Sequence, residues 1–176
     1  MKKLIILIVL IIIGSLTVFF FYEKSAEEKA YQPVGFGNEY IGEAIEDYVL
    51  TQEYFTWKTQ ENSVNFCSVD NLGSKDDLFP LSVWVYCGEY VLENDNVKIT
   101  SGFSGPAKID YPNELSFYDV ERFSYQHPKD GASYSENIKE MFSKNVQENI
   151  LSFDVEEISK ITEQKAIDYF NYLKEE

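Results

Sequence analysis

The chain has 176 residues, a formal net charge of −15 at pH 7 and an aromatic content of 16%. With 30 acidic and 15 basic residues it is repelled by nucleic acid and by anionic headgroup surfaces, so neither is expected as a partner. The length is sufficient for one domain with a hydrophobic core of its own.

The first predicted element is an uncharged apolar run from Leu4 to Tyr22. As a helix it extends about 28 Å, which nearly matches the roughly 30 Å hydrocarbon core of a bilayer. Lys2 and Lys3 precede the run, and the positive-inside rule then keeps the N-terminus in the cytoplasm and exports the remainder. We therefore predict a single-pass membrane anchor over residues 1–22, in contact with the lipid bilayer through residues 4–22.

A cleaved signal peptide is the alternative interpretation of this run. The run is long for a signal peptide, and it ends in the aromatic residues 19–22, a residue type that favours the membrane–water interface. An uncleaved anchor is therefore favoured, whereas cleavage would make the protein secreted. In both cases residues 23–176 are extracytoplasmic.

Residues 23–40 are predicted to form a linker between the anchor and a folded domain. The stretch is charged at first, then contains Pro33, Gly35 and Gly37, and it has no apolar period. A linker of this kind lets a folded domain stand away from the membrane surface. The extracytoplasmic domain is accordingly predicted to span residues 41–176.

The folded domain is predicted to begin with a helix from Ile41 to Tyr54. Apolar residues recur there at helical spacing and so share one face, namely Ile41, Ala44, Ile45, Tyr48 and Val49. This face is expected to pack against the rest of the domain.

The apolar period then changes to two, which predicts strands over residues 63–70, 81–92, 97–111 and 115–125. Short turns join them, so the sheet should be antiparallel. In the second strand Val83, Val85 and Cys87 share one face, and Trp84 and Tyr86 share the other. Apolar residues on both faces predict a central strand that is covered on both sides. Pro106 in the third strand predicts a bulge or an edge.

The helical period returns after Gly131. Ser133 with Glu136, and Asp154 with Glu157, form capping-box patterns that each predict the start of a helix. The fold class is therefore predicted to be α+β, with an N-terminal transmembrane helix, one helix packed on a four-stranded antiparallel sheet, and two or three C-terminal helices.

One helix followed by a four-strand meander resembles the cystatin-like and NTF2-like folds over about residues 41–125. This resemblance concerns the order of the elements and implies no site residues. The blocks SVNFCSVDNLG, LFPLSVWVYCGEY and SGPAKIDYPNELSFYDVERFSY also resemble uncharacterised single-span envelope proteins of bacteria. That second resemblance implies a membrane location and brings no known activity.

The chain contains two cysteines, Cys67 and Cys87. An even cysteine count in an exported chain favours a disulfide between them. Two buried thiols on neighbouring strands, or a reactive pair, are the alternatives. Two cysteines at this spacing with a single histidine make a poor ligand set, so no metal site and no cofactor are predicted.

No catalytic residues are predicted, because the sequence lacks a nucleophile motif with the G-x-S-x-G spacing. His127 is the only histidine and is expected at a strand end. Paired carboxylates are the remaining route to hydrolysis, and four acidic residues lie on predicted strands: Glu89, Asp110, Asp119 and Glu121. Nothing in the sequence ranks one pair of them above another.

The aromatic residues of the strands provide the one positive indication of function. If one face of the sheet lacks a cover, its aromatic side chains form a binding patch, for which the candidates are Trp84, Tyr86, Tyr90 and Tyr118. If the C-terminal helices cover that face, the same residues belong to the core. The sequence thus favours a non-catalytic, membrane-anchored binding domain with a protein, peptide or glycan partner. An anchored hydrolase that uses carboxylates and an accessory subunit of a membrane complex are the alternatives.

Overall fold

The computed structural model describes residues 36, 39–75, 79–110 and 122–175. The chain divides into two compact units, Met1–Gln32 and Pro33–Glu176, and every described residue lies in the second. The apolar run from Leu4 to Tyr22 and most of the predicted linker lie outside the described residues. Within the described residues, no helix has the length and apolar character needed to cross a membrane.

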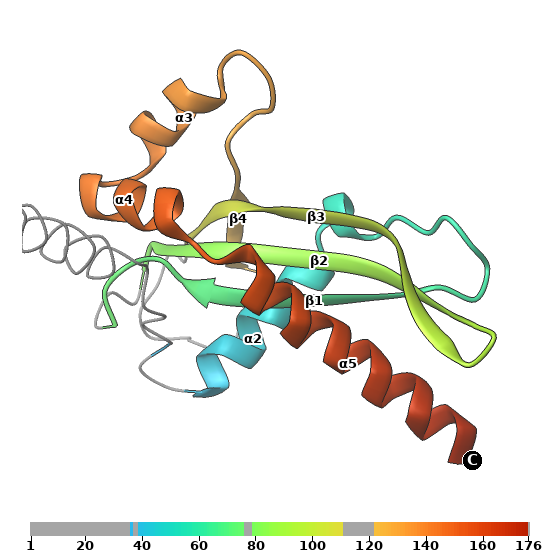
Figure 1. Ribbon diagram of the computed structural model, residues 1–176. Helices are drawn as coiled ribbons and strands as arrows, with labels where there is room; N and C mark the ends of the chain where they lie inside the picture. Colours follow the sequence, from blue (N-terminus) through green and yellow to red (C-terminus); the bar gives the residue numbers. More distant parts are fainter. Residues whose placement is uncertain (1–35, 37–38, 76–78, 111–121, 176) are drawn as a thin grey trace, which may run out of the picture. The chain divides into compact units, whose positions relative to one another are not determined.

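The domain is an α+β fold, as predicted (Figure 1). All strand pairs are antiparallel, and the sheet has the order β1-β2-β3-β4. Three helices follow the sheet in the described part of the chain. The elements are α2 (Glu39–Leu50), the short 3-10 helix η1 (Glu53–Phe55), β1 (Val64–Asn71), β2 (Leu81–Glu93), β3 (Asn96–Asp110), β4 (Ser124–Gln126), α3 (Tyr134–Met141), α4 (Lys144–Ser152) and α5 (Val155–Glu175).

The first three strands begin and end within one residue of the prediction, whereas the first helix differs more. The first helix ends at Leu50 rather than at Tyr54, because Thr51 and Gln52 turn the chain by hydrogen bonds to the last carbonyls of α2. The fourth strand, predicted over residues 115–125, is described only as Ser124–Gln126, since residues 111–121 lie outside the described chain.

Pro106 lies where the sequence predicts an edge or a bulge. It pairs with Trp84 of β2 on one side, whereas β4 pairs with β3 only at residues 108–110. On its other side Pro106 therefore faces no strand in the described part of the chain, and its missing N–H removes no ladder hydrogen bond. The one irregularity between β2 and β3 lies instead between Glu89 and Tyr90.

The predicted caps of the C-terminal helices have different outcomes. Asp154 accepts a hydrogen bond from the Glu156 N–H at 2.9 Å and so caps the start of α5. Ser133 precedes α3 but makes no capping bond through its side chain. The predicted helix start is therefore right at both positions, whereas the predicted side-chain cap forms only at Asp154.

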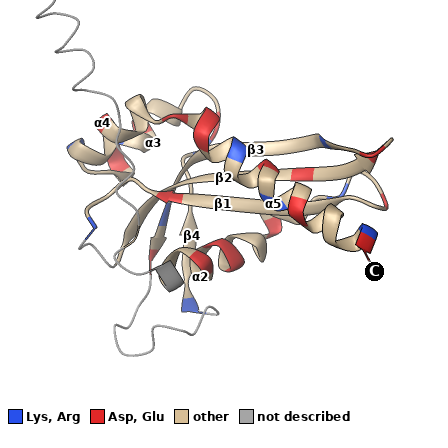
Figure 2. Cartoon of the chain, turned by 60° about the horizontal axis from the view of Figure 1, so that its bottom comes forward, with Lys and Arg blue, Asp and Glu red and all other residues tan. Residues whose placement is uncertain are grey.

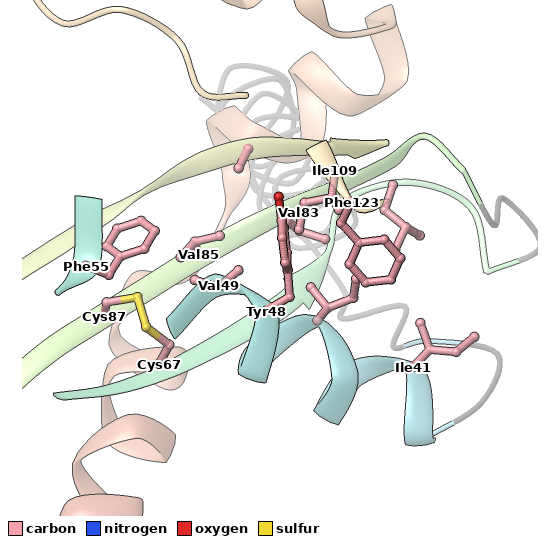
Figure 3. Packing of buried hydrophobic residues seen from close by; sticks show 13 residues of the cluster. Ile41, Tyr48, Val49, Phe55, Cys67, Val83, Val85, Cys87, Ile109 and Phe123 are labelled. Carbon is pink, nitrogen blue, oxygen red and sulfur yellow. A yellow bond between two sulfur atoms is a disulfide. The ribbon is translucent and has the colours of Figure 1, made fainter. Parts of the chain in front are cut away.

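The main core lies between α2 and one face of the sheet (Figure 3). The predicted helix face is buried there, and it meets the alternate strand residues Leu81, Val83, Val85 and Cys87 together with Ala107 and Ile109 of β3. Burying one such aliphatic side chain stabilises the fold by about 1.5–3 kcal/mol. The period of two in β2 therefore positions α2.

The long helix α5 covers the opposite face of the sheet (Figure 1). Its buried stripe recurs every fourth residue, at Ile158, Thr162, Ala166 and Phe170. The small residues at its centre let the helix approach closely, and the Thr162 hydroxyl is satisfied by the Ile158 carbonyl at 2.9 Å. Strand β2 is thus covered on both sides, as its sequence predicts.

The two cysteines form the predicted disulfide, with an S–S distance of 1.98 Å. Cys67 of β1 lies directly opposite Cys87 of β2 in the register of the sheet. Both residues are buried beneath the end of α2 (Figure 3). The bond therefore ties the edge strand β1 to the central strand within the main core.

Candidate binding groove

An open groove of about 520 Å³ lies between the C-terminal half of α5 and the adjoining ends of β1 and β2. The loop that joins η1 to β1 forms its other wall. Three elements distant in sequence therefore build the groove. It is lined by Lys58, Glu61, Asn62, Ser63, Val64, Leu92, Tyr169, Phe170, Leu173 and Lys174.

Three apolar side chains in this groove are partly exposed to solvent. Leu92 is 36% exposed, Tyr169 38% and Leu173 47%. The Tyr169 ring rests edge-on against Phe66 of β1, with ring centroids 5.5 Å apart, and so has a defined position. Neighbouring exposed apolar residues in a concave site are typical of a surface that contacts a partner.

Lysine side chains stand beside the apolar residues of the groove. Lys174 forms an ion pair with Asp95 at 3.0 Å, which joins the end of α5 to the hairpin between β2 and β3. Lys58 is exposed on the loop and forms no ion pair within the described part of the chain. Figure 2 shows that Asp and Glu are spread over α2 and α5. The groove therefore carries charges of both signs, because Glu61 also lines it and Asp95 neutralises Lys174.

The loop wall of the groove is held by a buried carboxylate, Glu89 of β2. Glu89 is fully buried. Its Oε1 accepts hydrogen bonds from the Thr59 N–H at 2.5 Å and from the Ser63 hydroxyl, and its Oε2 accepts from the Thr59 hydroxyl at 2.6 Å. Thr100 of β3 adds a further hydroxyl at 2.9 Å. Because Ser63 itself lines the groove, Glu89 fixes the loop at the point where the groove is formed.

This hydrogen bonding determines the ionisation of Glu89. Burial alone raises the pKa of a carboxyl group, because it disfavours the charged form. Here the hydrogen bonds from Ser63, Thr59 and Thr100 outweigh burial and lower the pKa of Glu89 from 4.5 to about 2. The carboxylate is therefore charged at neutral pH and accepts strong, charge-assisted hydrogen bonds.

The sequence places Glu89 among the strand carboxylates but does not reveal this role. A signal for its burial is present, because Glu89 continues the period-two series Val83, Val85, Cys87 on the face that packs against α2. The series predicts that residue 89 points inward. The donors that make burial of a charge tolerable lie in a loop about 30 residues earlier and follow no pattern in the sequence.

The three described residues of the predicted aromatic patch differ in what covers them. Trp84 is stacked on Phe153 with centroids 4.5 Å apart, and its Nε1 donates to Ser104 at 2.9 Å. Tyr90 is buried beneath α5 with Ala166 and Phe170, so it belongs to the core. Tyr86 is half-buried on the same face, and Tyr118 lies outside the described residues. Leu92, Tyr169 and Leu173 of the groove are among the exposed apolar residues of the described chain.

Other residues singled out from the sequence have unremarkable surroundings in the described chain. His127 follows β4 directly, at the strand end where it is expected, and packs edge-on against Tyr54 with ring centroids 4.4 Å apart. Asp110 is the last residue of β3, and Asp119 and Glu121 lie outside the described residues. In the described ranges, no group of three or more His, Cys, Asp or Glu side chains is placed to hold a metal ion.

Comparison of the chain with protein-family models, with curated proteins and with solved structures finds no match.

Proposed function

We propose that the chain is a non-catalytic, membrane-anchored binding domain that contacts its partner outside the cytoplasm through the groove. The observation that carries the proposal is an exposed apolar groove beside a loop that a buried carboxylate holds in place. A site ordered in advance loses little conformational entropy on binding, which favours affinity. The membrane location rests on the apolar run at residues 4–22 and the lysines that precede it.

The chemistry of the groove favours a peptide segment of another envelope protein as the partner. Leu92 and Leu173 suit aliphatic side chains, and the exposed Lys58 suits a carboxylate on the same segment. A glycan usually requires flat, open aromatic rings, and Tyr169 is the one ring among the groove residues with substantial exposure. If the partner belongs to a membrane complex, the chain is an accessory subunit of that complex.

The hydrolase alternative gains nothing from Glu89. A general acid must hold a proton near neutral pH, and the pKa of Glu89 is about 2. Its carboxylate is also buried and occupied by hydrogen bonds from the loop. Glu89 is therefore proposed as a positioning residue of a binding site.

Photo-crosslinking in intact cells tests the groove directly. A photoreactive amino acid at position 173 of the full chain is expected to give a protein adduct of discrete size, and the same probe at position 161 is not. Ile161 is the matched control, because it is 49% exposed on the same helix but lies outside the groove. An equal yield of adducts at both positions would contradict the groove as the contact surface.

Protease treatment of cells tests the predicted topology. The layers outside the cytoplasmic membrane are first made permeable to the protease. Residues 41–176 are expected to be digested while the cytoplasmic membrane remains sealed, because the chain crosses it once with the N-terminus inside. A cytoplasmic protein measured in the same samples must stay intact. Full protection of residues 41–176, with digestion only after lysis, would place the domain in the cytoplasm.

A further inference from the structure

Strand β1 forms one edge of the sheet, because it pairs with β2 and with no other strand of the described chain. The outward N–H and C=O groups of an edge strand are a template for pairing with a strand of another chain. In an antiparallel pair these groups alternate along the strand. On β1 the Cys67 carbonyl and the Val69 N–H point away from β2, since both bond to side chains at the edge.

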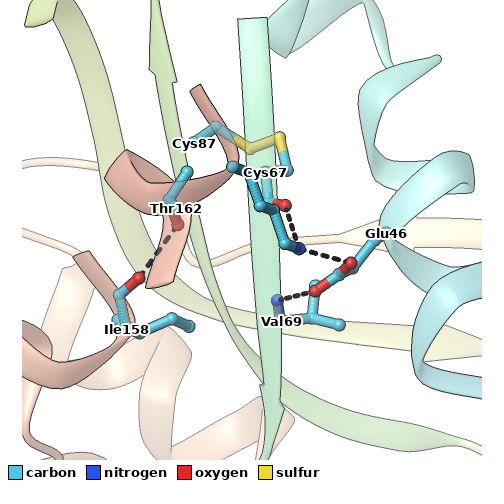
Figure 4. A network of polar contacts seen from close by, with 7 residues as sticks. Glu46, Cys67, Val69, Cys87, Ile158 and Thr162 are labelled. Carbon is cyan, nitrogen blue, oxygen red and sulfur yellow. Dashed lines mark hydrogen bonds and ion pairs between the residues drawn. A yellow bond between two sulfur atoms is a disulfide. The ribbon is translucent and has the colours of Figure 1, made fainter. Parts of the chain in front are cut away.

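Two charged side chains occupy these edge groups (Figure 4). The Lys165 ammonium donates to the Cys67 carbonyl at 3.0 Å, and the Val69 N–H donates to Glu46 Oε1 at 3.2 Å. Lys165 and Glu46 also pair with each other, with Nζ 2.6 Å from Oε2. The Cys67 carbonyl and the Val69 N–H are thus each satisfied by a charge, and the two charges neutralise each other.

The ion pair between Glu46 and Lys165 bridges the edge of the sheet, because the two side chains come from helices on opposite faces. Glu46 belongs to α2 on one face of the sheet, and Lys165 belongs to α5 on the other. A strand added to β1 must enter between the two helices, where the pair lies. The side chains are 24% and 34% exposed, so solvent reaches the pair and can replace it.

We propose that the Glu46–Lys165 pair is an edge cap that prevents β1 from pairing with β1 of a second copy of this chain. The second copy is the partner to expect, because antiparallel pairing of two β1 strands is self-complementary about a two-fold axis. In chains tethered to one membrane the local concentration would be high, which makes an unprotected edge a liability. The tether rests on the proposed function, whereas the edge contacts do not.

The test compares the full chain with the double variant Glu46→Ala, Lys165→Ala, each with detergent micelles in excess. Sedimentation is expected to show a self-association constant at least about tenfold above wild type. Hydrogen exchange of the Val69 amide is expected to be faster in the dilute double variant and to slow at high concentration, when β1 strands pair. A second variant, Lys165→Met, keeps the packed stem of the side chain, removes the ammonium group with its charge and leaves Glu46 on the Val69 N–H, so it should give a smaller change of the same sign.

The control is Glu156→Ala with Lys160→Ala, which removes an exposed ion pair from the same helix, with Nζ and Oε1 2.5 Å apart. It changes charge equally but leaves the edge capped, so it should behave as wild type. Equal self-association in the control would assign the effect to charge and overturn the proposal. If both edge variants remain folded and monomeric at every concentration, the helices themselves block the edge and the pair is not the cap.

Discussion

Replacement of Glu89 by alanine is expected to lower the free energy of unfolding by about 3 kcal/mol. The substitution removes the carboxylate that accepts from the Thr59 N–H and from the Ser63 and Thr100 hydroxyls, and of these residues Ser63 is buried. The loop between η1 and β1 then loses its attachment to the sheet. We therefore expect the groove to lose its loop wall in the same variant.

Urea unfolding of the full chain in detergent, followed by tryptophan fluorescence, measures this effect. Both tryptophans, Trp57 and Trp84, lie in the folded domain, so the signal reports its unfolding. Glu61→Ala is the control, because Glu61 is an acid of the same loop and lines the groove but is not a hydrogen-bond partner of Glu89. If Glu89→Ala and Glu61→Ala lower the free energy of unfolding by the same amount, the Glu89 carboxylate does not hold the loop.

The same carboxylate gives the domain a defined dependence on pH. Because folding lowers the pKa of Glu89 from 4.5 to about 2, the unfolded chain binds the proton more readily. The stabilisation from Glu89 is therefore complete above about pH 4.5 and is lost as the pH falls towards 2. The difference in unfolding free energy between wild type and Glu89→Gln should be constant above this window and shrink within it, whereas a difference independent of pH would exclude the lowered pKa.

Removal of the disulfide is expected to cost about 3 kcal/mol, the loop-closure entropy of a 20-residue separation. The variant Cys67→Ala, Cys87→Ala frees the edge strand from β2 in the unfolded chain. Its unfolding midpoint in urea should lie well below that of the oxidised wild type. The matched comparison is wild-type protein that has been reduced under denaturing conditions and then refolded. Equal unfolding midpoints for the oxidised wild type and the variant would contradict the prediction.

The order of the secondary structure could be predicted because its signals are local. The helical spacing of Ile41, Ile45, Tyr48 and Val49 and the alternation of Val83, Val85 and Cys87 each depend on a few adjacent residues. Short turns then require antiparallel strands, and the even cysteine count favours the disulfide that the structure contains. The ends of elements were less predictable. The first helix ends at Leu50, for example, because the residues that follow it turn back to bond the last carbonyls of α2.

The predicted binding surface illustrates the limit of the same reasoning. Strand alternation places Trp84, Tyr86 and Tyr90 on one face, which is correct, but it cannot reveal what covers that face. Helix α5 covers Tyr90 and Phe153 stacks on Trp84, whereas Leu92 and Leu173, at the groove, are among the residues that stay exposed. Coverage depends on where a later helix packs, and no pattern within the strand records it.

The sequence by itself determined the α+β order, the faces of the strands and the cysteine pair, because backbone geometry ties each of these to neighbouring residues. Only the tertiary structure decided the groove, the role of Glu89 and the cap on β1. These depend on partners far apart in the chain: Ser63 and Glu89 are separated by 26 residues, and Glu46 and Lys165 by 119. Such contacts are created by packing, which brings together groups that no local period relates.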